Sequence, residues 1–256
     1  MSQLTAFIRK EFTEFVRSGK IIIFLAVFII FGIMNPATAK LTPWLMDMMS
    51  KQLAENGMIV SNVEVTAMTS WEQFFKNIPM VLIVFVVMFS AIVTKEYQSS
   101  TLTNIITKGM KRWKILASKA VLMIVVWTVG CLTGYGITYG YNAYFWDNGV
   151  AHNIFFACFA FYLAGVWLIS VIMLASSAGN TTSFVMMSAL AAFAAAYIIG
   201  VIPSLTKYVP TYLMASTNLL TGAKAAQDYL AAIAVTLGLI VLNAFAAVKI
   251  FKHKIL

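Results

Sequence analysis

The sequence predicts an all-α integral membrane protein with six transmembrane helices, and two observations lead to this fold class. The first is composition: 61 % of the 256 residues are hydrophobic and 11 % are charged, whereas soluble domains are roughly 45–50 % apolar and about 25 % charged. The second is the presence of six apolar runs, each about as long as the roughly 20 residues that a bilayer requires. No loop between these runs can form a separate soluble domain, so we expect one transmembrane domain over residues 1–256.

The chain begins with a predicted amphipathic helix over residues 3–17, within an interfacial segment 1–20. At about 100° per residue, one face of this helix is apolar (Leu4, Phe7, Ile8, Phe12, Phe15, Val16) and the other is polar (Arg9, Lys10, Glu14, Arg17). Such a helix is expected to lie along the inner membrane surface. Glu11 falls inside the apolar face, where a carboxylate needs a partner or must become neutral. Two interpretations stay open: Glu11 reaches the headgroups or is protonated, or it forms an internal ion pair.

The predicted spans follow at residues 21–39, 74–93, 120–144, 154–177, 183–202 and 230–248. The second is the weakest because Lys76, Asn77 and Pro79 interrupt its start, although proline is tolerated near a helix beginning and Lys76 can reach the headgroups. The first could instead belong to a cleavable signal peptide. We favour a span, because the leader is long and patterned and Pro36 stands beside the possible cleavage site.

Positive charges give the orientation. If the N-terminus lies in the cytoplasm, 13 of the 18 Lys and Arg residues lie in cytoplasmic parts and 5 lie outside. An excess of Lys and Arg marks cytoplasmic loops. We therefore expect a multi-pass protein of the cell membrane with both termini in the cytoplasm.

The cytoplasmic loop between spans two and three, residues 94–119, is longer than a turn requires. Residues 101–106 can form a short helix, with Ser99 or Ser100 as its N-cap and Gly109 as its terminator. A solvated basic anchor is the alternative interpretation. The loop also supplies possible partners for Glu11, namely Lys95, Arg112 and Lys114. We expect Arg112 to be the partner, because its planar guanidinium can hold a carboxylate with two hydrogen bonds.

Two outer segments are also predicted to be ordered in part. Residues 40–73 contain a helix-like start at Trp44–Leu53. Residues 203–228 are too interrupted to cross the membrane and too apolar for a free loop, so short helices packed on the outer ends of the spans are expected there.

Motifs for catalysis are lacking in the sequence. It contains no GxxxxGK[ST] phosphate loop and no HExxH metalloprotease motif, and no ionisable residue lies in the middle of a predicted span, where ion-driven carriers usually need one. The net charge of +9 is spread over short loops, which argues against nucleic-acid binding. Cys131 and Cys158 lie in apolar runs and are expected to be small buried side chains. We therefore predict no catalytic residue, no cofactor and no metal in this chain.

Several segments resemble the permeases of the ABC-2 exporter group, the membrane subunits of ATP-binding-cassette transporters. They are Lys10-Glu11-Phe12 with Arg17-Ser18-Gly19-Lys20, Pro36 with Ala39-Lys40 and Pro43, and above all residues 94–119, with Glu96, a short helix and Arg112-Trp113-Lys114-Ile115-Leu116. The chain departs from the pattern where it has Ser100-Thr101 in place of Gly-Thr and Gly109 in place of a proline.

The resemblance implies an externally driven exporter. A separate ATPase subunit would bind ATP and Mg²⁺ and dock on the short helix, through residues among Ser100, Thr101, Leu102, Thr103, Ile105 and Ile106. Glu96, Lys95 and Lys114 would support the loop. A second permease subunit and membrane lipid would complete the assembly. The cargo would be hydrophobic or amphipathic, such as a peptide, a peptide antibiotic, a drug or a lipid. The alternatives are a membrane anchor or sensor that docks a cytoplasmic protein, and a passive channel.

Overall fold

The computed structural model describes residues 3–54, 65–99, 101–107 and 109–254, and this part of the chain is helical apart from its turns. The α-helices are α1 (Gln3–Arg17), α2 (Lys20–Ala54), α3 (Ala67–Phe89), α4 (Ala91–Gln98), α5 (Thr101–Thr107), α6 (Arg112–Phe145), α7 (Ile154–Ala178), α8 (Thr182–Gly200), α9 (Thr217–Leu220) and α10 (Leu230–His253). Short 3₁₀ helices join them: η1 (Asn148–Val150), η2 (Thr206–Tyr208), η3 (Pro210–Met214) and η4 (Ala226–Tyr229). The all-α fold class is confirmed.

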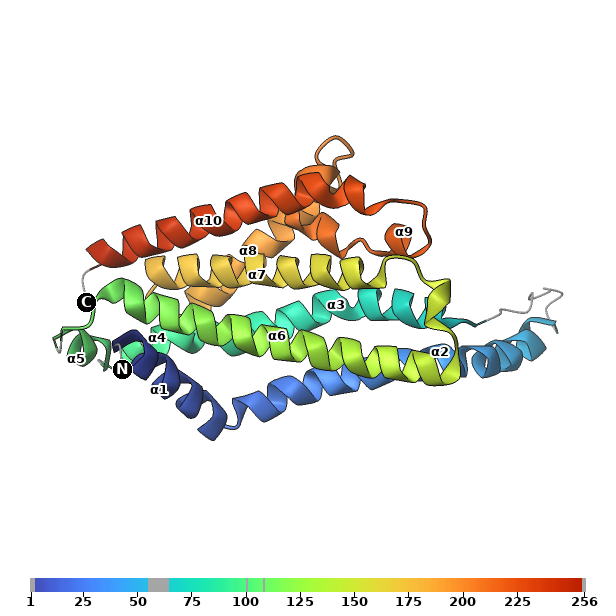
Figure 1. Cartoon of the computed structure of the whole chain (residues 1–256), viewed down its shortest axis with the longest axis horizontal. Helices are drawn as coiled ribbons and strands as arrows, with labels where there is room; N and C mark the ends of the chain where they lie inside the picture. Colours follow the sequence, from blue (N-terminus) through green and yellow to red (C-terminus); the bar gives the residue numbers. More distant parts are fainter. Residues whose placement is uncertain (1–2, 55–64, 100, 108, 255–256) are drawn as a thin grey trace.

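Within the described residues, 6 helices are long and apolar enough to cross a membrane, which confirms the predicted number of spans. They cover Lys20–Met48, Ala67–Gln98, Arg112–Phe145, Ile154–Ala178, Thr182–Gly200 and Ala226–His253. The fifth helix ends before the predicted limit of 202, and the other predicted spans lie within the observed helices. Both termini lie at one end of the bundle, which we call the terminal end, and α6 meets α7 at the opposite, far end (Figure 1).

The N-terminal amphipathic helix is present as α1, a helix separate from the first span. Ser18 and Gly19 separate α1 from α2, and the φ of Gly19 is +71°, a left-handed conformation that glycine adopts without strain. α1 packs chiefly on α6, and its buried side chains are Phe7, Glu11 and Phe15, which recur every four residues along one face. The predicted position along a membrane surface stays a prediction.

The centre of the bundle is α7, the most buried of the six spans, and it packs closely along α10 (Figure 1). Gly165 on α7 lies directly against the Trp127 ring of α6. A Cβ at position 165 would approach that ring to 2.1 Å, so only glycine allows the two helices to come this close. The indole nitrogen of Trp127 donates to the Tyr162 carbonyl at 3.1 Å. This contact fixes α6 on α7 near the middle of both helices.

Two small-residue pairs on α6 could serve packing within the chain or between subunits. Gly130 and Gly134 serve the chain itself: Cβ atoms there would lie 2.6 Å and 3.0 Å from the Phe28 ring of α2. A Cβ atom added at Gly136 or Gly140 would meet no other atom within 4 Å in the described part of the chain.

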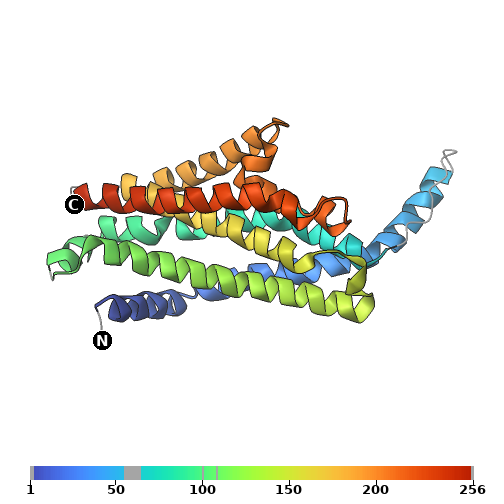
Figure 2. The same cartoon turned by 45° about the horizontal axis from the view of Figure 1, so that its top comes forward.

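The first span continues further than predicted. α2 runs from Lys20 to Ala54 through Pro36 and Pro43, and so joins the predicted span to the helix expected at Trp44–Leu53. Both prolines lie inside this helix, and each removes one backbone hydrogen-bond donor. The last part of α2 leaves the bundle at the far end as an arm (Figure 2).

The predicted short helices between spans five and six are present as η2, η3, α9 and η4. All five residues of η3 are buried. The Tyr212 and Tyr229 rings stack with centroids 4.7 Å apart, and the Tyr229 hydroxyl donates to the Ala215 carbonyl at 2.6 Å. These contacts make the far end an ordered cap over α7 and α10.

Candidate functional site

The loop that the sequence singled out lies at the terminal end, where α1, α4, α5 and the beginning of α6 meet (Figure 1). α5 is a helix of 7 residues that follows α4 closely. It ends in a Schellman motif: the Gly109 N–H donates to the Ile106 carbonyl at 2.9 Å, and the Met110 N–H donates to the Ile105 carbonyl at 3.4 Å. The φ of Gly109 is +85°, which explains a glycine at this position.

The predicted docking residues differ in where they lie. Leu102 is 1 % exposed, so its side chain anchors α5 to the bundle and faces away from any partner. Ile105 and Ile106 are half-buried against the core. Thr101 and Thr103 belong to α5, but the structure does not describe their side chains, and Ser100 lies outside the described residues.

A hollow of about 340 Å³ lies between α1 and α5. Ile105 and Met110 line it from the α5 side, and Gln3, Ala6, Phe7 and Lys10 line it from α1. Its floor is apolar and its rim carries an amide and an ammonium group. This is the shape and chemistry that accepts an apolar side chain of a docked protein. Sequence reasoning named Ile105 but did not foresee the contribution of α1.

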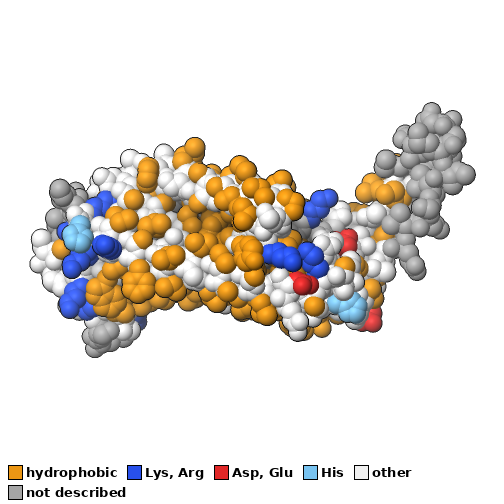
Figure 3. Space-filling view, turned by 90° about the horizontal axis from the view of Figure 1, so that it is seen from above, with side chains coloured by type: hydrophobic (Ala, Val, Ile, Leu, Met, Phe, Trp, Pro, Cys, Tyr) orange, Lys and Arg blue, Asp and Glu red, His pale blue; other side chains and the backbone are white. Residues whose placement is uncertain are grey.

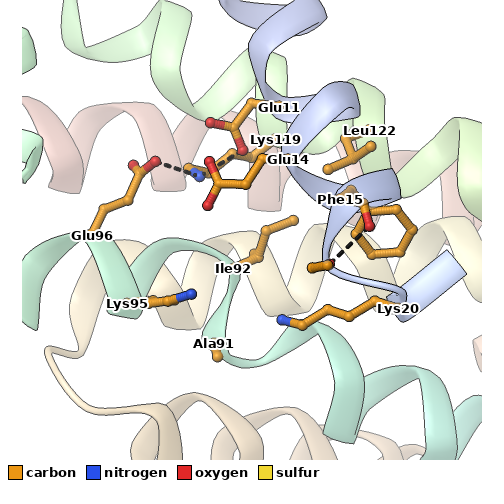
Figure 4. A pocket seen from close by; sticks show the side chains of 11 residues that line it. Glu11, Glu14, Phe15, Lys20, Ala91, Ile92, Lys95, Glu96, Lys119 and Leu122 are labelled. Atoms are coloured by element: carbon orange, nitrogen blue, oxygen red, sulfur yellow. Dashed lines mark hydrogen bonds and ion pairs between the residues drawn. The ribbon is translucent and has the colours of Figure 1, made fainter. Parts of the chain in front are cut away.

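Beneath this surface, Lys119 of α6 forms the buried centre of an ion cluster made up of Lys10, Glu11, Glu14, Glu96 and Lys119. Figure 4 shows Lys119 with its partners Glu11 and Glu96. The Lys119 side chain is 2 % exposed, and its ammonium lies 2.9 Å from Glu11 Oε2 and 3.0 Å from Glu96 Oε1. Because Glu11 belongs to α1 and Glu96 to α4, one ammonium joins three helices. A buried charge of this kind is stable only when its partners are in place.

Lys10 closes the same cluster from the surface. Its ammonium lies 3.0 Å from Glu11, 2.9 Å from Glu14 and 3.3 Å from Glu96. Partial burial alone would lower the pKa of Lys10, but its hydrogen bonds to Glu14 and Glu11 outweigh burial and raise that pKa above its usual range. The hydrogen bond from Lys10 lowers the pKa of Glu14 below its usual value. Three carboxylates thus share two ammonium groups.

The predicted partner of Glu11 is wrong. Arg112 is occupied elsewhere: its Nη1 donates to the carbonyls of Phe251 at 3.1 Å, Lys252 at 3.3 Å and Lys254 at 2.5 Å. The last carbonyls of a helix have no donors within it, and a guanidinium can supply several at once. Arg112 therefore caps α10, and Lys119 takes the role expected of Arg112.

Lys119 was missed because the third span was expected to begin at residue 120, which placed Lys119 in the loop. α6 begins at Arg112, so Lys119 lies about two turns inside it. Ile115 and Met123, four residues to either side, are 0 % exposed. The apolar spacing of residues 115, 119 and 123 was the signal that could have identified a buried lysine.

The structure also places the three residues that were expected to support the loop between spans two and three. Glu96 belongs to the ion cluster. Lys114 donates to the Gln3 side chain at 3.0 Å and so ties the start of α6 to the start of α1. Lys95 is exposed and lines, together with Lys20, a hollow of about 90 Å³ beside the cluster (Figure 4).

A second, polar hollow of about 540 Å³ lies toward the far end, between α3, α8 and the short helices. Its lining includes Glu72, Gln73 and Lys76 from α3, Tyr197 from α8 and Thr217 from α9. Nearby, the Asn77 amide donates to the buried Asn35 side chain of α2 at 2.6 Å. Sequence reasoning expected Lys76 at the headgroups and did not anticipate a charged pocket here.

Among the residues that the structure describes, no three His, Cys, Asp or Glu side chains are placed to share a metal ion.

The sequence profile of the family described as "ABC-2 family transporter protein" matches residues 5–211. The match runs from the first turn of α1 to η3 and includes α5, the ion cluster and five of the six spans. No curated protein matches the chain.

Proposed function

Because the chain belongs to the ABC-2 family of transporter proteins, we propose that it is the membrane-spanning permease subunit of an ABC exporter. ATP and Mg²⁺ bind to a separate ATPase subunit, which this chain docks at its terminal end. ATP binding closes the ATPase pair, the docking surface moves, and the spans rearrange to release cargo on the outer side.

The observation that carries this proposal is the link between the docking surface and the spans. α5 continues from α4, and α4 and α1 both hold the buried Lys119 of α6. A push on the hollow between α1 and α5 would therefore reach the third span through ion pairs of about 3 Å. A loop that only anchored the protein to headgroups would need no such connection.

The terminal end lies in the cytoplasm of a multi-pass cell-membrane protein in this proposal. The Lys and Arg residues counted as cytoplasmic all come from segments that meet at the terminal end: the N-terminus, the loop between spans two and three, and the end of α10. On the face shown in Figure 3, basic side chains gather at that end. Their excess there supports the orientation by the positive-inside rule.

A second permease subunit, identical or different, completes the transporter. α8 and α10 are the least buried spans and leave apolar faces for a subunit or for lipid. The cargo is hydrophobic or amphipathic. The polar hollow with Glu72 and Lys76 beside apolar spans supports an amphipathic cargo, such as a peptide, over a wholly apolar one.

Affinity purification from the native membrane tests the central proposal. A tagged full chain should co-purify with a protein that carries a GxxxxGK[ST] phosphate loop. Repeated recovery of a different cytoplasmic protein, without any such ATPase, would favour the alternative of an anchor or sensor subunit.

Filling the hollow tests the docking surface. Ala6 is exposed and lines the hollow, so Ala6→Trp should block the ATPase by occupying the space its side chain needs. We expect co-purification of the ATPase to fall about tenfold or more, which corresponds to about 1.4 kcal/mol. The control is Ala234→Trp, at another exposed alanine, on α10. Equal recovery of the ATPase with both variants would place docking elsewhere.

A further inference from the structure

An apolar groove of about 250 Å³ opens between α6 and α10, with α7 as its floor. Leu116 and Ile124 line it from α6, Val166 and Met173 from α7, and Ile240 and Val248 from α10. The groove exists because the residues between these large side chains are alanines on both walls: Ala117 and Ala120 on α6, and Ala244 and Ala247 on α10. α10 follows α7 closely but contacts α6 much less.

Water is a poor occupant of this groove. Apart from Trp113 on the rim, Ser170 is its one polar lining residue, and the Ser170 hydroxyl is already used: it donates to the Trp167 carbonyl at 2.6 Å and accepts from the Asn243 amide at 3.0 Å. Ordered water needs two to four polar partners, and apolar cavities of about 150 Å³ stay dry and bind apolar molecules. An apolar ligand is therefore required to fill the space.

The surroundings identify that ligand. All three walls are membrane spans, so the groove lies among lipid chains. At its terminal end the rim carries Trp113 and Val248, which are 44 % and 42 % exposed. A tryptophan at a helix end is typical of the membrane–water interface.

The rim is also cationic. Lys252 follows Val248 by one helical turn and is exposed, and Lys249 and Lys111 are exposed close by in the chain. Neither α6 nor α10 contains an acidic residue. Figure 3 shows basic side chains gathered at this end, next to the apolar face of the bundle. A headgroup held here would be anionic, because nearby lysines attract negative lipids.

We propose that the groove between α6 and α10 is a lipid-binding site that holds one acyl chain of an anionic phospholipid, with its headgroup at Lys252. The bound lipid bridges the two helices whose ends Arg112 also joins. It fills the space that the four alanines leave and stabilises α10, one of the least buried spans.

Lipid binding to the purified full chain in a neutral detergent tests this site, with native mass spectrometry as the readout. The probes are phosphatidylglycerol and phosphatidylcholine with identical oleoyl chains. The wild type should bind phosphatidylglycerol more tightly. Lys252→Gln should weaken phosphatidylglycerol binding about fivefold, since one lysine near the surface contributes about 1 kcal/mol, and should leave phosphatidylcholine unchanged. Lys207→Gln, which removes an exposed lysine at the far end, should change neither.

Ala244→Leu tests the acyl chain, because a leucine there occupies the groove. It should weaken binding of both lipids about tenfold, whereas Ala234→Leu on an exposed part of α10 should bind them as the wild type does. The melting temperature without lipid should stay equal or rise, since the leucine fills a cavity, and Ala120→Leu gives a second test if Ala244→Leu fails to fold. Wild-type lipid binding in both filled variants, or equal affinity of the wild type for the two lipids, would overturn the proposal.

Discussion

The two ends of the molecule are held together by different chemistry. At the terminal end, Lys119 and Lys10 join α1, α4 and α6 through contacts of 2.9 to 3.3 Å with three carboxylates. At the far end, the short helices are fixed by ring stacking and by hydrogen bonds to backbone carbonyls, such as the bond from Tyr229 to Ala215. One end depends on a few buried charges. The other depends mostly on neutral contacts, to which Lys224 adds a hydrogen bond to the Tyr212 hydroxyl at 2.8 Å.

This difference suits the two ends to different roles: the terminal end can change its ion pairs, and the far end covers α7 and α10 and keeps its shape. A charged group can exchange one partner for another without a change in helix packing. The loss of a partner costs much free energy, because the remaining charge stays buried. Neutral contacts are individually small, so the far end should lose stability in small steps. The terminal end is thus suited to transmit motion from a docked protein, and the far end to keep its shape.

The largest effect is expected for Lys119→Met. The substitution removes the buried cation that Glu11 and Glu96 share and leaves them next to the half-exposed Lys10, so it should lower the free energy of unfolding by about 3 kcal/mol. Thermal unfolding of the purified protein measures this. Lys95→Met is the matched control, because Lys95 is an exposed lysine of the same region.

Neutralising the partners should recover stability. The triple variant with Lys119→Met, Glu11→Gln and Glu96→Gln contains no buried charge at this point and should regain most of the loss. If Lys119→Met is as mild as the far-end variant described below, the contrast between the two ends disappears.

A smaller effect is expected for Glu11→Gln, because Glu96 still pairs with Lys119. We expect a loss of about 1–2 kcal/mol in stability and a stronger loss of coupling between ATP hydrolysis and transport than of membrane insertion. Glu14→Gln, whose side chain is 57 % exposed, is the control and should do little to either. Full coupling in Glu11→Gln would show that α1 does not transmit motion.

The surroundings of Glu11 and Lys119 also show how much of the fold and of the ion cluster the sequence predicts. Composition and run length gave the number of spans, because both depend only on the bilayer. The position of Glu11 on the apolar face followed from helical spacing alone. Its partner did not, because the start of α6 at Arg112 is set by packing of α1 and the capped end of α10, contacts between residues about 100 or more positions apart.

The far end was harder still to predict in detail. Proline residues and apolar character predicted short helices between residues 203 and 228, and η3 and α9 are there. The stacking of Tyr212 on Tyr229 and the polar hollow depend on how α3, α8 and α10 meet in space. The residue pattern within one segment does not predict how separate helices pack against one another.

At the far end, Tyr229→Phe sharpens the comparison. It removes only the hydrogen bond from the hydroxyl to the Ala215 carbonyl and keeps the ring stack. We expect a loss of about 1 kcal/mol in unfolding free energy and unchanged coupling. A loss of coupling as large as that of Glu11→Gln would make the far end part of the switch.

The smallest expected effect is a loosening of α1 at acidic pH. The folded-state pKa of Glu14 is lowered from its usual value of 4.5, chiefly by the hydrogen bond from Lys10. The stability from this pair is therefore present above pH 4.5 and is lost as the pH falls through the lowered pKa. Lys10 stays charged throughout, since its pKa is raised and its contribution is lost only above its usual value of 10.5. The effect is small because both side chains are about half exposed and water screens them.

A spin label on exposed Thr13, introduced as Thr13→Cys after replacement of Cys131 and Cys158 by alanine, should become more mobile below pH 4.5. A label at Thr221→Cys on the far end should not respond. In Glu14→Gln the mobility of the label on α1 should no longer respond to acid, and a wild-type acid response in that variant would assign the titration to another carboxylate of the cluster.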